Sequence, residues 1–174
     1  MTECLDLINE KLVSDIKYNA EQKMNSISFR KLWNIVIAQF PLGRHSIHGP
    51  GHWKQVEKNG LLLAQETGVD ETLIRLFAIF HDSRRTNDGI DDGHGLKGAE
   101  LAKALRGQYF DLPDDSFEIL IDACSNHTCG QCSSNMTIAT CWDADRLDLP
   151  RVGITPDPDR MCTAPGRRLA RALG

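Results

Sequence analysis

An adjacent histidine and aspartate, His81 and Asp82, follow an apolar segment at residues 73–80. In a helix, residues i, i+3, i+4, i+7 and i+8 share one face, so both polar residues continue a stripe that begins at Ile74 and Phe77. A carboxylate on a core-facing stripe is costly unless a cation or several hydrogen bonds compensate it. An imidazole beside a carboxylate suits a divalent metal ion, namely Mn, Co, Ni, Fe, Mg or Zn. The alternative is a helix end at which both side chains only cap turns or pair with the arginines that follow.

Two other polar residues also interrupt apolar helix faces. His52 lies on the inward face of a predicted helix over 52–67, one turn before an apolar residue of the same face. Asp145 falls within the apolar stripe of a predicted helix over 137–149, whereas Asp143 lies about 200° away around the helix axis. The spacing therefore favours Asp145 over Asp143 as an inward-facing carboxylate.

Helical periodicity dominates the elements that must position these residues, and no convincing strand pattern or internal repeat is present. We therefore expect an all-α fold and a single domain over 1–174, with N-terminal helices within 4–40 and a mostly irregular C-terminal tail over 151–174. The expected helices lie at residues 4–19, 29–40, 52–67, 70–82, 96–105, 114–124 and 137–149, with a short terminal helix at 167–173.

The composition is that of a globular protein, with 174 residues, 41% apolar and 25% charged. The formal net charge of -4 disfavours nucleic acid as a partner. The first residues do not form a signal peptide, and no stretch is long and apolar enough to cross a membrane. We therefore expect a cytoplasmic protein with no membrane partner, in which the six cysteines stay reduced.

The order His52, then His81 and Asp82, then Asp145, each on its own helix, resembles the HD superfamily of metal-dependent phosphohydrolases, whose pattern is H, HD, D. The segments HGPGHWKQV, FAIFHDSRRTNDGIDDGHG and CWDADRLDLPRVGI resemble a branch of small uncharacterised bacterial HD-domain proteins. The resemblance covers about residues 45–154. It implies a compact HD-domain helical bundle, and the run DADRLDL again selects Asp145 as the ligand.

The resemblance implies one divalent metal ion held by His52, His81, Asp82 and Asp145, with coordination positions left for water and phosphate. The expected activity is hydrolysis of a nucleotide or another small phosphorylated molecule by a metal-activated water, which Asp82 would orient. The alternatives are a di-iron oxygenase on the same scaffold and a metal-stabilised module that binds a nucleotide without turnover. The sequence leaves the substrate, the metal and the oligomeric state open, and a homodimer is one option.

Several residues near these motifs could contact the substrate. Arg84 and Arg85 follow the His-Asp pair, where a guanidinium could bind phosphate, although salt bridges to nearby aspartates would also explain them. His94, in a glycine-rich loop, is a candidate for catalysis, for substrate binding or for a second metal. His127 closes a helix and could bind phosphate, a second metal or only helix carbonyls. His48 lies in a loop that is expected to border the site.

The sequence leaves open the roles of two loop histidines and of a group of cysteines. His45 shares the loop of His48, and both could be plain loop residues. A rival metal site is formed in sequence by His127 with three cysteines in the pattern H-x-C-x2-C-x8-C, which could bind structural zinc. Those cysteines are Cys129, Cys132 and Cys141.

Overall fold

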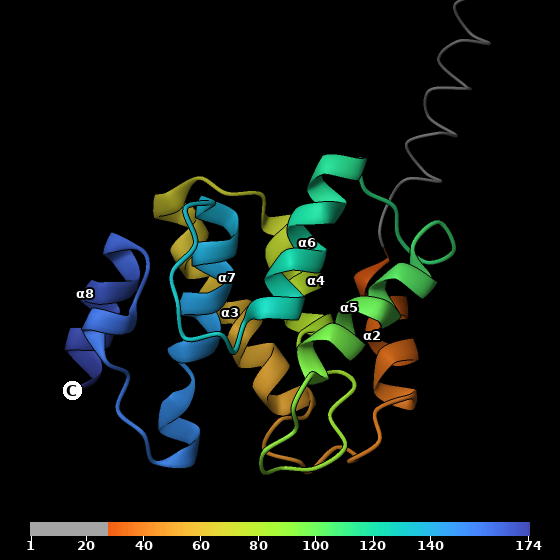
Figure 1. Ribbon diagram of the computed structural model, residues 1–174, viewed down its shortest axis with the longest axis horizontal. Helices are drawn as coiled ribbons and strands as arrows, with labels where there is room; N and C mark the ends of the chain where they lie inside the picture. Colours follow the sequence, from red (N-terminus) through yellow and green to blue (C-terminus); the bar gives the residue numbers. More distant parts are fainter. Residues whose placement is uncertain (1–27) are drawn as a thin grey trace, which may run out of the picture.

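The computed structural model describes residues 28–174, and within them it contains seven α-helices and no β-strand. The all-α prediction is therefore confirmed, while the predicted helix over 4–19 lies outside the described residues. The helices are α2 (Phe29–Ala38), α3 (Pro50–Thr67), α4 (Glu71–Phe80), α5 (His94–Leu105), α6 (Asp114–Asn126), α7 (Met136–Arg146) and α8 (Ala164–Leu173), with 3₁₀ turns η1 (Leu149–Val152) and η2 (Pro158–Arg160) (Figure 1).

Local sequence signals explain where these helices begin and end. Pro50 occupies the first turn of α3, where its missing N–H costs nothing, and Gly68 ends this helix with φ of 70°. Asp70 then caps α4 by accepting a hydrogen bond from the amide of Thr72 at 2.7 Å. The helix α7 ends at Arg146, earlier than predicted, and the chain continues into η1. None of the helices in residues 28–174 is long and apolar enough to cross a bilayer.

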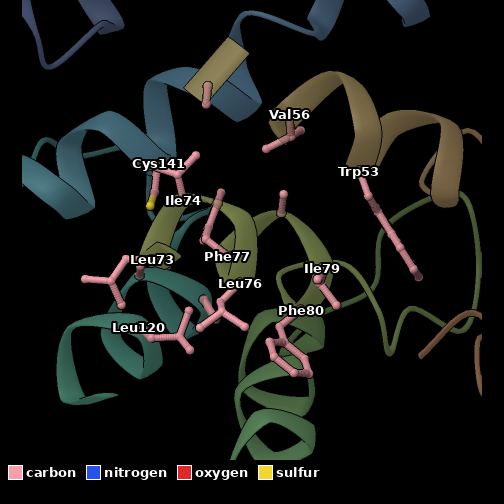
Figure 2. Close-up of a cluster of buried hydrophobic side chains, with 14 of the residues drawn as sticks. Trp53, Val56, Leu73, Ile74, Leu76, Phe77, Ile79, Phe80, Leu120 and Cys141 are labelled. Carbon is pink, nitrogen blue, oxygen red and sulfur yellow. The ribbon is translucent and has the colours of Figure 1, made fainter. Parts of the chain in front are cut away.

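The helix α4 forms the centre of the molecule, because neighbouring helices cover it on several sides. All of its residues from 73 to 80 are buried except Arg75, which is partly exposed. Figure 2 shows Val56 of α3, Leu120 of α6 and Cys141 of α7 around this segment. Burying a Leu, Ile or Phe side chain contributes about 1.5–3 kcal/mol, so this contact surface fixes the position at which α4 ends.

Two glycines allow α5 to approach its neighbours closely. A Cβ atom at Gly98 would collide with the carbonyl oxygen of Phe80 at the end of α4. A Cβ atom at Gly95 would collide with the carbonyl oxygen of Cys124 and lie 3.0 Å from Nδ1 of His127. The start of α5 is therefore held against the ends of both α4 and α6.

The C-terminal tail is more ordered than the sequence predicted. It contains η1, η2 and a terminal helix that begins at Ala164 and is therefore longer than the predicted 167–173. The tail is anchored by Asp143, which is fully buried and accepts hydrogen bonds from the amides of Cys162 and Thr163 at 2.7 and 2.8 Å. Long-range anchoring of this kind leaves no periodic signal in the tail itself, so periodicity could not reveal it.

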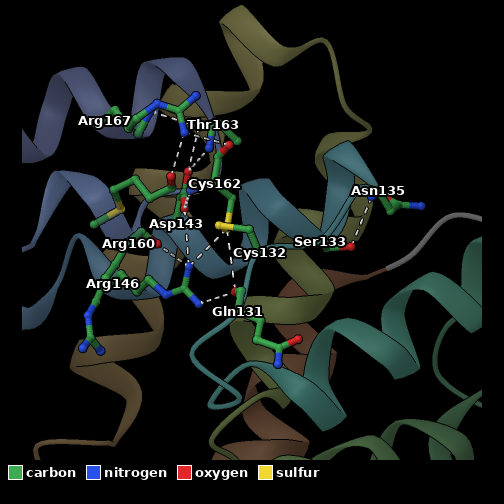
Figure 3. The surroundings of a disulfide bond; sticks show 12 residues. Gln131, Cys132, Ser133, Asn135, Asp143, Arg146, Arg160, Cys162, Thr163 and Arg167 are labelled. Carbon is green, nitrogen blue, oxygen red and sulfur yellow. Dashed lines mark hydrogen bonds and ion pairs between the residues drawn. A yellow bond between two sulfur atoms is a disulfide. The ribbon is translucent and has the colours of Figure 1, made fainter.

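The expectation that all cysteines stay reduced is wrong for one pair. Cys132 and Cys162 form a disulfide with their Cα atoms 5.1 Å apart, and Figure 3 shows it beside the Asp143 anchor. The tail returns along α7 and brings together two cysteines that are 30 positions apart. Because Cys132 is bonded to Cys162 and Cys141 is buried inside the core, the rival zinc site loses two of its ligands.

Candidate metal centre

Five helix ends meet at one end of the bundle and bring six polar residues together. His52 lies in the first turn of α3, His81 and Asp82 directly follow α4, and His94 is the first residue of α5. His127 follows α6, and Asp145 lies in the last turn of α7. In Figure 1 the loops over 39–49 and 81–93 hang from this end of the molecule.

The first cluster contains the four residues that the sequence predicted as metal ligands. Nε2 of His52 lies 3.1 Å from Nε2 of His81 and 3.1 Å from Oδ1 of Asp145. Oδ2 of Asp82 lies 3.7 Å from His52 Nε2 and 3.8 Å from His81 Nε2. The structure therefore gathers two imidazoles and two carboxylates around one point.

A second cluster uses the other oxygen of the same aspartate. Asp82 Oδ1 lies 3.0 Å from Nε2 of His94 and 3.5 Å from Nε2 of His127, and these two nitrogens are 3.0 Å apart. Both histidines are buried, although His94 was expected in a loop. Asp82 thus presents one oxygen to each cluster.

The residues present fit divalent metal ions in both clusters. Asp82 Oδ1 is a buried oxygen without a hydrogen-bond partner among the described residues, and such an atom calls for a cation. An octahedral ion with bonds of about 2.1 Å holds neighbouring ligand atoms about 3.0 Å apart, which matches the shortest separations in each cluster. Oxygen and imidazole donors of this kind suit first-row divalent metals or Mg.

Each of the four buried histidines has its second ring nitrogen held by an acceptor. Nδ1 of His81 faces the carbonyl oxygen of Phe77 at 3.2 Å. The other acceptors are the carbonyl oxygens of Asp91 for His94, at 2.6 Å, and of Cys124 for His127, at 2.8 Å, and a carboxylate oxygen of Asp148 for His52, at 2.7 Å. A proton on Nδ1 leaves the lone pair on Nε2, so all four rings present a metal-binding nitrogen to the clusters.

The electrostatics of the first cluster favour a bound cation. Burial by itself would lower the pKa of His52, but hydrogen bonds to Asp145 and Asp148 outweigh it and raise the pKa to about 9. Burial lowers the pKa of His81 to about 3, so this ring is neutral. Burial opposes ionisation of Asp82 and Asp145, yet the neighbouring histidines hold the pKa of both carboxyls below its usual range. The cluster therefore carries two carboxylates at neutral pH.

The two arginines after the His-Asp pair point in different directions. Arg84 directs its guanidinium to the carbonyl oxygen of Gln39 at 3.4 Å. Arg85 is buried, with Nη1 3.1 Å from His94 Nε2 and 3.6 Å from Asp82 Oδ1. Only the second of these arginines reaches the clusters.

The two histidines of the loop before α3 differ in their distance from the clusters. Nδ1 of His48 lies 2.9 Å from Oδ2 of Asp82 and 3.3 Å from Nη2 of Arg151, so this ring borders the first cluster. His45 is exposed and makes no contact with either cluster. Five of the six histidines thus converge on one place in the molecule.

Sequence reasoning missed two residues of this site. Asp148 holds His52, and Arg151 lies 3.7 Å from Asp148 while its Nε donates to the carbonyl oxygen of Ile47. A weak signal existed, because Asp148 follows Asp145 by three positions and would lie on the same side of a continued helix. In the structure α7 has already ended, so helical spacing alone could not assign this contact.

Comparison with known proteins places the fold. No model of a known protein family matches the sequence, and a search of curated proteins finds no significant match. Among solved structures, the chain is similar to the crystal structure of a predicted HD superfamily hydrolase from an uncultured Thermotogales bacterium. The two chains are 24% identical with a TM-score of 0.68, and the match covers 83% of each. The chain therefore has the helical fold of that protein.

Proposed function

We infer that this protein is a metal-dependent phosphohydrolase that acts on a nucleotide or another small phosphorylated molecule. The observation that carries this inference is the shared carboxylate of Asp82, which gives one oxygen to each of two His-rich clusters. His52, His81, Asp82 and Asp145 would hold the first metal ion. Such an ion supplies Lewis acidity and lowers the pKa of a bound water towards neutrality.

The chain's own residues then divide the remaining tasks. Asp82 orients the attacking water, because its ionised carboxylate lies between the two clusters and can accept a hydrogen bond from that water. Arg85 supplies a guanidinium for the phosphate oxygens, and His94 and His127 lie within reach of the same group. His48 borders Asp82 from the loop before α3, where it can hold or give a proton to the leaving oxygen. Arg84 points away from this place, so we assign it no contact with the substrate.

A second candidate is a di-iron oxygenase, and the second cluster is the observation that favours it. His94, His127 and Asp82 would provide the ligands of a second iron. The two candidates differ in what the loaded protein consumes. A hydrolase releases phosphate without oxygen, whereas an oxygenase consumes O₂ and requires two irons per chain.

The test loads the full chain separately with Mn, Co, Ni, Mg and Fe, and measures both O₂ consumption and phosphate release, the latter coupled to an added phosphomonoesterase where the substrate is a cyclic nucleotide. The substrates are nucleoside mono-, di- and triphosphates, cyclic nucleotides, pyrophosphate and an aryl phosphate. We expect phosphate release that the Asp145→Ala variant loses and that the matched surface variant Asp159→Ala retains, with equal helical content by circular dichroism. Equal release by the Asp145→Ala variant would contradict the proposal, and O₂ consumption with two irons would replace it.

A further inference from the structure

Arg85 is a buried cation at the second cluster, and its position is fixed by the loop that contains it. Its Nη2 donates to the carbonyl oxygen of Gly89 at 2.6 Å, and its side chain is only 8% exposed. The loop is itself held by Asp91, which accepts hydrogen bonds from the amide and hydroxyl of Thr86 at 2.6 and 3.0 Å. The guanidinium is therefore part of the site and does not simply extend into solvent.

This guanidinium lies against the ring of His94, whose Nε2 a second metal ion would need. Nδ1 of His94 donates its proton to the carbonyl oxygen of Asp91, so the lone pair of this ring lies on Nε2. Nη1 of Arg85 lies 3.1 Å from that Nε2 and 3.4 Å from Nδ1 of the same ring. The same Nη1 is 3.6 Å from Asp82 Oδ1, the oxygen for which residues 28–174 supply no hydrogen-bond partner. A metal ion at this cluster must therefore tolerate a fixed positive charge beside its ligands.

Among the described residues, no guanidinium lies against the ligand atoms of the first cluster, although His48 Nδ1 lies 2.9 Å from Asp82 Oδ2. It combines two carboxylates, Asp82 and Asp145, and a third carboxylate, Asp148, lies behind His52. Its nearest arginine, Arg151, is directed to Asp148 and to the backbone of the loop before α3. The two clusters therefore attract a divalent ion very unequally, because the second has a single shared carboxylate offset by a guanidinium.

We propose that Arg85 makes the second cluster a conditional metal site, which fills readily only when a phosphate group draws the guanidinium off His94. A phosphate offers Arg85 a paired acceptor and brings negative charge between the clusters, so it offsets the positive charge that opposes a metal ion at the second cluster. Linkage requires the converse as well, so the second metal ion strengthens phosphate binding by the same factor. The inference rests on the proposed function in one respect, since phosphate is the group that the substrate would carry.

The experiment measures Mn²⁺ binding to the full chain by isothermal titration calorimetry, with and without inorganic phosphate. Electron paramagnetic resonance separates isolated Mn²⁺ from an exchange-coupled pair. Without phosphate, we expect one tightly bound ion and a second that binds at least about 10-fold more weakly. Phosphate should tighten the second ion by about 10-fold and produce the coupled signal, within the usual range of coupling between sites.

Substitution of Arg85 tests whether its guanidinium causes the weaker binding of the second ion. In the Arg85→Met variant, which keeps an unbranched side chain without charge, the second Mn²⁺ should bind about 10-fold more tightly without phosphate, and the phosphate effect should be smaller than in the unaltered protein. The matched control is Arg84→Met, which removes the adjacent guanidinium that points to Gln39 and should leave both affinities unchanged. The proposal is overturned if phosphate leaves the second affinity of the unaltered protein unchanged. It is also overturned if folded Arg85→Met protein binds the second ion no more tightly.

These readouts are independent of turnover. A protein that shows the phosphate-dependent second ion but hydrolyses no phosphorylated compound would support the inference while the proposed function fails. Hydrolysis with two equally tight ions would support the function and refute the inference. If Arg85→Met does not fold, calorimetry on the unaltered protein with and without phosphate still tests the proposal.

Discussion

The two clusters share Asp82 and use the same kinds of donor, yet their surroundings differ. The first has a second carboxylate, Asp145, and a carboxylate behind one of its histidines. The second relies on two imidazoles whose far nitrogens face only backbone carbonyls, and it contains a guanidinium. The difference teaches that ligand type alone does not set metal affinity, because the nearest charges decide how much each set of donors attracts a cation.

Asp82→Asn should have the largest effect, because it changes the side chain that gives one oxygen to each cluster. The amide keeps the size of the side chain but loses its charge. We expect Mn²⁺ binding to weaken by more than the roughly 100-fold seen for outer partners of metal ligands, with loss of both ions. Calorimetry and elemental analysis would measure this, and retention of one tight ion would show that the clusters do not depend on a common carboxylate.

Asp148→Asn should weaken one cluster selectively. The variant removes the charge that holds Nδ1 of His52, so the first Mn²⁺ should bind about 10- to 100-fold more weakly. The second ion, measured with phosphate present, should be affected far less. The matched control is Asp159→Asn on the surface, and equal weakening of both ions would argue against separate environments.

The pH dependence of Mn²⁺ binding should distinguish the histidines of the first cluster. In the metal-free protein the pKa of His52 is raised to about 9, so a metal ion must displace a proton below that pH. The pKa of His81 is lowered to about 3, so that ring has no proton to lose at neutral pH. Affinity should therefore rise by about tenfold per pH unit towards pH 9, which calorimetry across the neutral range would show. A flat profile would contradict the raised pKa.

The raised pKa of His52 makes the metal-free fold less stable as the pH rises, whereas it makes metal binding stronger. A raised pKa stabilises the folded state fully below the ordinary value of 6.5, and this contribution is lost as the pH rises through about 9. Thermal unfolding of metal-free protein should therefore show a stabilising contribution of His52 that declines above neutral pH. The Asp148→Asn variant should reduce this decline, because it removes one of the hydrogen bonds that raise the pKa.

Cys132→Ser should have the smallest effect on the clusters. A disulfide that closes a loop of this size stabilises a fold by about 3–4 kcal/mol, so the variant should unfold at a lower urea concentration. Both Mn²⁺ affinities should stay unchanged, because the disulfide joins the tail to the loop before α7. Addition of a reductant to the unaltered protein is the matched condition, and loss of metal binding in either case would show that the tail supports the clusters directly.

Much of the fold followed from the sequence because helix formation leaves local signals. Helical spacing of apolar residues located the helices, and Gly68 and Asp70 marked ends that the structure contains, whereas α3 begins at Pro50 and not at the predicted His52. The predicted order of His52, His81, Asp82 and Asp145 on separate helices also corresponds to the first cluster. The tail was predicted poorly, since its order depends on Asp143 and on a disulfide between distant positions.

The sequence by itself determined which helices exist and which of their faces carry histidine or aspartate, because both properties depend on neighbours within a few positions. Only the tertiary structure decided that Asp82 divides its two oxygens between two clusters and that Arg85, unlike Arg84, turns towards them. It also decided that Asp148 stands behind His52. These contacts join helix ends that are far apart in the chain, and their distances and charges are set by how the helices pack, which no local pattern records.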